Sequence, residues 1–318
     1  YNIHGVDIDP RAVQISALSL WLRGHRTWKQ QNVKPIDRPQ IRKSNIVCAE
    51  PMPGEKDLLC EFTEKLEPRV LGQLVEVIFE KMELAGEAGS LLKIEEEIEG
   101  AIEEARESFN KEIRHRELPK QSALFPETKK PKQLNLFDFT DLPSKTDFWY
   151  TAEQQILEAL HNYAEYVEGS DRLRLRLFAE DATKGFAFID LCSKRFDVVL
   201  MNPPFGDATP HTIKMVKTVY SDYAENLYVA FYGRATSLLH DRGFVGVISS
   251  RTFVTYRDFE KFRERLLNEN RISVLADLGW QVLDTAQVET AAYVTEKTTV
   301  HKSLIGPFYR LLSVPLDL

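Results

Sequence analysis

The stretch Arg195-Phe-Asp-Val-Val-Leu-Met-Asn202-Pro-Pro-Phe205-Gly206 decides the expected fold. Its apolar run at residues 198–201 is typical of a buried strand in a parallel sheet. The run ends at Asn202-Pro203-Pro204, because proline cannot donate to the hydrogen-bond ladder of a strand. We therefore expect a polar amide, two rigid residues and the ring of Phe205 at the carboxyl end of a buried strand. Open α/β sheets bind their ligands at that edge.

These residues suit an amino group on a planar ring. The side-chain carbonyl of Asn202 can accept one N–H, and a backbone carbonyl in the Pro203-Pro204 segment can accept the other. Two such acceptors draw the lone pair of the amine out of conjugation, which makes the nitrogen nucleophilic. Phe205 offers a face for stacking, and a base in such a pocket must first leave its duplex. A strand followed by an ordinary Pro-Pro turn is the simpler alternative.

Asn202-Pro-Pro-Phe205 resembles the [DNS]-PP-[FYW] motif of S-adenosylmethionine-dependent amino-methyltransferases, above all those that methylate N6 of adenine in DNA. The resemblance implies that Asn202 and the Pro203 carbonyl hold the flipped amino group. Pro204 completes the rigid loop, and Phe205 stacks on the base. The resemblance also implies direct in-line transfer of the methyl group, with orientation supplying much of the acceleration.

The amino-terminal stretch Gly5-Val-Asp7-Ile-Asp9-Pro10 predicts a strand that leads into a helix over residues 11–26. Proline suits the first turn of a helix. The stretch resembles the second methyltransferase motif, which implies that Asp7, with Ile8 beside it, binds the cofactor ribose. Asp9 is predicted to cap the helix, and capping by both acids without a ligand is the alternative. Helical spacing places four apolar residues on one face: Ala12, Ile15, Leu18 and Leu22.

A third strand is predicted at Asn45-Ile-Val-Cys-Ala-Glu50, ended by Pro51. It resembles the motif whose acid contacts the cofactor adenine, with Glu50 in place of aspartate. Asp181 is a rival for this role. We prefer Glu50, because apolar residues continue a helical spacing through Asp181.

In the methyltransferases that these motifs resemble, a glycine-rich loop precedes the Asp7 strand. The chain begins at Tyr1, so we expect a sequence truncated at its amino terminus, and a segment that is inactive alone. The family sheet has the order 3-2-1-4-5-7-6, so loss of strand 1 leaves a gap between the Asp7 and Asn202 strands. Other residues fill that gap, the two neighbours pair directly, or the two halves separate.

The expected fold is thus α/β, a Rossmann-like methyltransferase sheet without its first strand and with a long helical insertion. The cofactor side is expected at 1–53, the insertion at 54–170 with a loop at 119–147, the catalytic side at 171–300, and the start of a following segment at 301–318. Helix and strand patterns complete the second half of the sheet: 224–240, 244–250, 259–267, 272–278 and 289–297. The order of motifs is similar to the BREX and DISARM phage-defence methyltransferases.

The insertion predicts an antiparallel helical hairpin at 54–118, acting as a solvated spacer or as a partner-binding arm. Gln133-Leu-Asn-Leu-Phe137 in the loop resembles the peptide that docks bacterial proteins onto the replication sliding clamp, and an apolar tether is the alternative. The polar stretch 207–222 predicts a mobile segment that faces the substrate. Gly243 is predicted to end the preceding helix in a left-handed cap.

Composition narrows the function classes. The chain has 318 residues and a net charge of −7, which argues against a main DNA-gripping surface but not against DNA as substrate. No apolar run is long enough to span a membrane. Cys48, Cys60 and Cys192 lack metal-ligand spacing and predict reduced thiols in a cytoplasmic protein, with no zinc site.

Three functions remain open from the sequence. The first is methylation of adenine N6 in DNA, in restriction-modification or phage defence, with S-adenosylmethionine as cofactor. The second is a non-catalytic binding scaffold with an incomplete cofactor site. The third is methylation of RNA or of protein glutamine, because those methyltransferases share the Asn-Pro-Pro-Phe type of motif.

Overall fold

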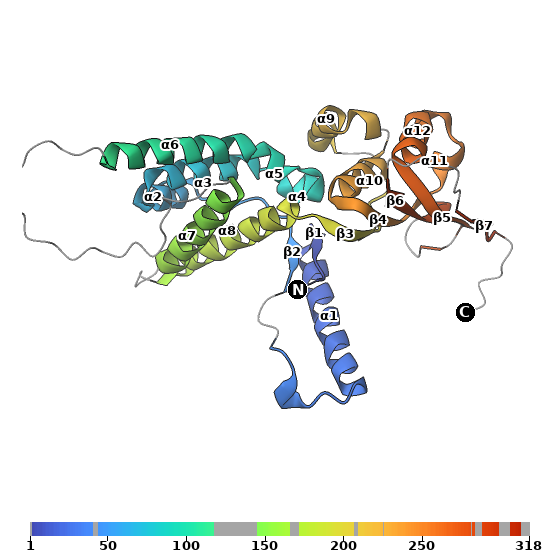
Figure 1. The fold of residues 1–318 in the computed structure, drawn as a ribbon, viewed down its shortest axis with the longest axis horizontal. Coiled ribbons are helices and arrows are strands. Elements are labelled where there is room, and N and C mark those ends of the chain that lie inside the picture. Colours follow the sequence, from blue (N-terminus) through green and yellow to red (C-terminus); the bar gives the residue numbers. More distant parts are fainter. Residues whose placement is uncertain are drawn as a thin grey trace, which may run out of the picture. The chain divides into compact units, whose positions relative to one another are not determined.

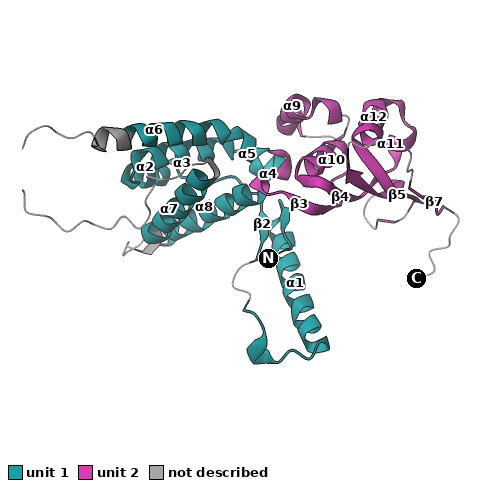
Figure 2. Ribbon diagram, viewed as in Figure 1, with its two compact units in different colours: residues 1–89, 93–191 teal, residues 90–92, 192–318 magenta. Residues whose placement is uncertain are grey.

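A computed structural model describes residues 2–40, 44–117, 145–165, 172–206, 209–224, 226–280, 282–283, 288–298 and 306–312. The chain divides into two compact units (Figure 2). Unit 1 holds residues 1–89 and 93–191, and unit 2 holds residues 90–92 and 192–318. The sliding-clamp motif at 133–137 lies outside the described residues.

Unit 1 begins with the predicted strand, helix and strand. These are β1 (Gly5–Asp7), α1 (Pro10–Gln30) and β2 (Ile46–Cys48), with a 3-10 turn, η1 (Pro35–Asp37), between the last two. The two strands pair in parallel, with Asp7 opposite Cys48. Proline stands in the first turn of α1, and the Asp9 carboxylate accepts the Arg11 N–H at 2.9 Å. The predicted cap is therefore confirmed.

The apolar face predicted for α1 is present but exposed. The exposed fractions are 65% for Ile15, 56% for Leu18 and 53% for Leu22. No residue of α1 is buried. The Asp9 cap and the proline in the first turn support the start of this helix, which also contacts β1 and β2.

The described residues of unit 1 that follow β2 are mostly helical (Figure 1). Its helices are α2 (Lys56–Lys65), α3 (Arg69–Lys81), α4 (Ala85–Ala88), α5 (Ile94–Glu97), α6 (Glu99–Glu117), α7 (Lys145–Glu165) and α8 (Arg172–Ser193). The last two residues of α8 belong to unit 2, as does most of the 3-10 turn η2 (Gly89–Leu91). The predicted hairpin at 54–118 is wrong, because that stretch breaks into more than two helices. Rings from α2, α3 and α8 meet in its core, where Phe178 lies 6.3 Å from Phe62 and 5.8 Å from Phe79 between ring centroids.

Unit 2 is built on a five-stranded sheet of order β3-β4-β6-β5-β7. The strands are β3 (Phe196–Met201), β4 (Leu239–Ser250), β5 (Asn270–Gly279), β6 (Thr290–Lys297) and β7 (Phe308–Arg310). β4 runs parallel to β3, and β6 runs antiparallel to both of its neighbours. This is the predicted order 4-5-7-6. β7 adds a further parallel partner to β5, so residues 308–310 extend this sheet.

The described strands form two separate sheets, and β1 does not pair with β3 within them. Direct pairing across the expected gap is therefore wrong. The buried environment predicted for β3 is also wrong on one face. Val198 is 55% exposed and Leu200 is 79% exposed, because β3 is an edge strand among the described residues. Val199 and Met201 point the other way and pack on the core.

The helices of unit 2 are α9 (Pro210–Val219), α10 (Leu227–Ser237), α11 (Thr252–Thr255) and α12 (Glu260–Glu269), with 3-10 turns η3 (Ser221–Tyr223) and η4 (Arg257–Phe259). They supply much of one hydrophobic core, which includes Tyr228, Tyr232, Phe253, Phe262 and Tyr293. Figure 1 shows α10, α11 and α12 beside the strands.

Unit 2 contains one helix that the sequence analysis did not predict, and its predicted glycine cap is wrong. The polar stretch after Gly206 contains α9, whose first turn is capped by the Thr209 hydroxyl. Gly243 lies within β4 and does not cap a helix; Arg242 has the left-handed conformation, with φ of 64°. Gly243 is needed for close packing, because an added Cβ would lie 3.0 Å from the His240 carbonyl oxygen and 3.1 Å from that of Asp197.

The contact between α2 and α3 yields a stability prediction. An alanine Cβ at Gly72 would lie 2.6 Å from the backbone oxygen of Thr63, so Gly72→Ala should lower the free energy of unfolding by about 1–3 kcal/mol. Gly100 in α6 has no neighbour within 4 Å of that position. Gly100→Ala should therefore stabilise the protein by about 0.5–1 kcal/mol. Urea denaturation measures both; equal effects would contradict the steric argument.

Candidate catalytic and cofactor sites

Several strand ends meet at one edge of the sheet in unit 2. β3, β4 and β5 point the same way, because β4 is parallel to β3 and β6 is antiparallel to both β4 and β5. The carboxyl ends of these three strands therefore share an edge with the amino end of β6. Asn202 follows β3 there, Arg251 follows β4, and Glu289 precedes β6. Sheets of this class bind ligands at this edge.

The predicted catalytic loop leaves the sheet at that edge. Asn202 is exposed, Pro203 is buried, Pro204 is exposed and Phe205 is half-buried. The last β3–β4 pair joins Met201 to Val247. Pro203 anchors the loop, while the amide of Asn202 faces outward and makes no hydrogen bond to any described residue. Its oxygen is thus available to accept from a ligand.

Gly206 ends the loop in a backbone conformation that favours glycine, with φ of 118°. Its carbonyl accepts the N–H of Leu227, the first residue of α10, at 3.3 Å. Asn226 caps that helix through its side-chain oxygen, which accepts from the N–H of Tyr228 at 3.4 Å. The loop and the start of α10 are therefore joined directly.

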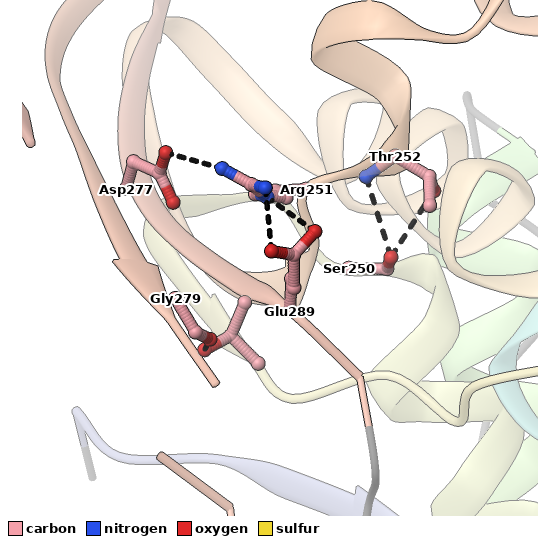
Figure 3. A network of polar contacts seen from close by, with 7 residues as sticks. Ser250, Arg251, Thr252, Asp277, Gly279 and Glu289 are labelled. Carbon is pink, nitrogen blue, oxygen red and sulfur yellow. Dashed lines mark hydrogen bonds and ion pairs between the residues drawn. The ribbon is translucent and has the colours of Figure 1, made fainter. Parts of the chain in front are cut away.

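An ion network that the sequence analysis missed fixes the same edge (Figure 3). The Arg251 guanidinium donates to both oxygens of Glu289, at 2.8 and 2.5 Å, and to Asp277 at 2.7 Å. The backbone N–H of Arg251 also donates to the Glu289 carbonyl at 2.9 Å. These bonds, first those to Glu289, raise the pKa of Arg251. One side chain thus ties together the ends of β4, β5 and β6. The sequence does show opposite charges near the expected strand ends. Which of them pair, however, can be told only when the register of the strands is known.

The predicted cofactor residues gather in unit 1. Asp7 ends β1 and Glu50 follows β2, so both acids stand at the carboxyl end of this small parallel sheet. The Asp7 carboxylate accepts the N–H of Asp9 at 2.8 Å and is exposed. Ile8 is 52% exposed, and its carbonyl accepts from the Cys48 thiol at 3.7 Å. Asp181, the rival of Glu50, lies within α8 and pairs with Lys184 at 2.7 Å.

Cys48 lies opposite Asp7 in the strand pair and two residues before Glu50. Burial raises the pKa of its thiol to about 12, with further contributions from a hydrogen bond to Glu50 and from the charges of Glu50 and Asp7. Two carboxylates around one buried thiol form an acceptor-rich surface that suits hydroxyl and amino donors. The sequence therefore brings Asp7, Ile8 and Glu50 together in unit 1. Asn202, Pro203, Pro204 and Phe205 come together in unit 2.

Residues 1–282 match the family described as Eco57I restriction-modification methylase. The chain belongs to this family. A curated relative, the adenine-specific methyltransferase BrxX of Escherichia coli O9:H4 (strain HS), is 26% identical over 129 residues. The match covers 38% of this chain and 10% of BrxX, so the chain spans about a tenth of the length of that relative.

Solved structures that are similar to parts of this Eco57I-family chain include the following three. The DrdV–DNA complex is 18% identical with a TM-score of 0.33, covering 52% of this chain and 21% of that one. A nuclease-deletion mutant of LlaGI with a DNA substrate mimic is 14% identical with a TM-score of 0.33, and the match covers 52% of this chain and 17% of LlaGI. The EcoKI M protein is 14% identical with a TM-score of 0.26, and the match covers 48% of this chain and 38% of the EcoKI M protein. Family membership rests on the match over residues 1–282 and not on these likenesses.

Across the described ranges, no helix has the length and apolar character needed to cross a membrane.

The thiol of Cys48 tests the arrangement of the cofactor residues. A pKa of about 12 leaves almost no thiolate near neutral pH, whereas Cys60 is exposed. At about pH 8, iodoacetamide should therefore alkylate Cys60 at least ~100-fold faster than Cys48. Glu50→Gln should speed the reaction of Cys48, because removing a neighbouring negative charge lowers the pKa of a thiol.

Peptide mass spectrometry after timed alkylation measures both rates. Glu55→Gln is the matched control, because Glu55 is the residue before α2 and its side chain makes no cap hydrogen bond. An equal acceleration of Cys48 in both variants would show that Glu50 does not face the thiol.

Proposed function

We propose that this chain carries the catalytic core of a methyltransferase that acts on the N6 amino group of adenine in DNA, in restriction-modification or phage defence. The observation that carries the proposal is the Asn202-Pro-Pro-Phe205 loop. The loop follows the carboxyl end of β3, and the exposed amide of Asn202 makes no hydrogen bond to any described residue. Membership in the Eco57I restriction-modification methylase family supports DNA as the substrate, and the name of BrxX supports adenine.

The loop residues have separate tasks in this proposal. Asn202 accepts one N–H of the adenine amine through its side-chain oxygen, and the Pro203 carbonyl accepts the other. This pairing directs the nitrogen lone pair away from the ring, toward the methyl donor. Phe205, half-buried beside the loop, stacks on a base that has left the duplex. Little base catalysis is needed, because the amino proton can leave to water after transfer.

S-adenosylmethionine is the methyl donor that the family implies, and it supplies a methyl group on a positively charged sulfur. The residues of unit 1 fit its nucleoside part. Asp7 has an exposed carboxylate with one oxygen bound by the Asp9 N–H, which leaves acceptor capacity for ribose hydroxyls. Glu50 is half-buried at the same strand end and can accept from an adenine amino group. Ile8, exposed between them, offers an apolar surface.

Asn202→Ala should abolish methylation while leaving cofactor affinity within about twofold. The expected loss in kcat is at least ~10²–10³-fold, the usual effect of removing one hydrogen bond that orients a transition state. Transfer of tritiated methyl groups to an adenine-containing DNA duplex measures kcat. Unchanged activity in Asn202→Ala would overturn the assignment.

Asp7→Ala is the complementary variant. It should weaken binding of S-adenosylmethionine, measured by calorimetry, by at least about tenfold, which corresponds to loss of a charge-assisted hydrogen bond. Binding by the 318-residue chain itself would show that its own residues suffice for the cofactor. Binding only after extension at the amino terminus would make the chain part of a larger cofactor site. Parallel assays with single-stranded RNA and with a glutamine-containing peptide decide the substrate class, and methylation of either in place of DNA would contradict the proposal.

A further inference from the structure

Helix α10 connects the catalytic loop to the interior of the sheet. Its first amide, that of Leu227, donates to the Gly206 carbonyl. Its next residue, Tyr228, turns inward and is 1% exposed. Whatever fixes the first turn of α10 therefore also fixes the end of the Asn202 loop.

Two tyrosines one turn apart pin α10 by the same kind of bond. The hydroxyl of Tyr228 lies 3.1 Å from that of Thr252, and the hydroxyl of Tyr232 lies 2.8 Å from that of Thr295. Both tyrosines are 1% exposed. Their partners differ in place: Thr252 follows the end of β4 at the ligand-binding edge, whereas Thr295 is five residues into β6 from that edge.

Thr252 is itself held firmly. Its hydroxyl lies 3.1 Å from that of Ser250, and its N–H donates to the Ser250 hydroxyl at 3.3 Å (Figure 3). The preceding residue, Arg251, is fixed by Asp277 and Glu289. The anchor for Tyr228 therefore lies next to the ion network of Arg251.

We propose that Tyr228 is a positioning residue for the catalytic loop, an inference that rests on the proposed methyltransferase function. The bond between its hydroxyl and Thr252 fixes the first turn of α10. The hydrogen bond from the Leu227 amide to the Gly206 carbonyl then fixes the end of the loop. Tyr228 touches no reacting atom in this arrangement. It sets the direction of the Asn202 amide by holding Gly206, at the far end of the loop.

Tyr228→Phe and Tyr232→Phe form a matched pair, because each removes one buried hydroxyl from the same face of α10. Both should lower the urea midpoint to a similar extent. Tyr228→Phe alone should accelerate hydrogen exchange of the Leu227 amide, by about tenfold, because that bond opens when the first turn is released. Exchange measured on the 318-residue chain requires neither cofactor nor substrate. Equal exchange in the two variants, or no change in either, would overturn the proposal.

Thr252→Val removes the hydroxyl that is bonded to Tyr228, so it provides a second test if the Tyr228→Phe variant does not fold. It should accelerate exchange of the Leu227 amide as Tyr228→Phe does. Thr252→Ser keeps a hydroxyl and should restore the original rate. The double variant should exchange no faster than Thr252→Val alone, because that variant has already lost the Tyr228–Thr252 bond.

Methylation kinetics test the consequence for catalysis. Tyr228→Phe should lower kcat about tenfold and leave KM for S-adenosylmethionine within about twofold, whereas Tyr232→Phe should leave both unchanged. A loss shared by both variants would assign Tyr228 a general structural role and overturn the proposal. A wild-type protein that methylates no DNA would instead remove the proposed function, and the exchange experiment would still decide whether Tyr228 positions the loop.

Discussion

The end of the β3–β4 ladder is the constraint on which the catalytic region depends. Prolines 203 and 204 have no N–H to donate, so the chain must leave the sheet after Met201. The departure occurs where β3, β4 and β5 all end and β6 begins. An amide at Asn202 is thereby placed, by backbone chemistry alone, at the edge where sheets of this class bind ligands.

Packing and charge then make that edge rigid. The Arg251 guanidinium joins the ends of β4, β5 and β6, and its fork geometry matches the Glu289 carboxylate. The side chains of Arg251 and Asp277 are largely buried, at 27% and 13% exposure. Removal of Arg251 would leave two carboxylates facing each other in a partly dry site. Such a network constrains geometry more surely than it adds stability.

Local patterns in the sequence predicted the elements of this edge well. Apolar runs bounded by proline, glycine and charge located β3, β4, β5 and β6, and the Asp9 cap marked the start of α1. Burial was not predictable in the same way: Val198 and Leu200 fit a buried strand, yet their exposure depends on which elements lie beside β3. α9 was missed because a polar stretch with proline looks like a loop, although Thr209 is a cap. The Tyr228–Thr252 bond joins residues 24 apart, so it follows from the fold and not from spacing.

The catalytic loop combines a rigid start with a permissive end, and this combination explains the need for α10. Pro203 and Pro204 have fixed φ angles, whereas Gly206, with φ of 118°, lacks the Cβ that restricts the backbone of other residues. Each backbone residue left free costs about 1–2 kcal/mol when it is finally ordered. A hydrogen bond from the first amide of α10 orders Gly206 in advance, and the buried hydroxyl of Tyr228 orders that amide in turn. In the proposed mechanism, the cost of orienting Asn202 is therefore met during folding and does not have to be met when a base binds.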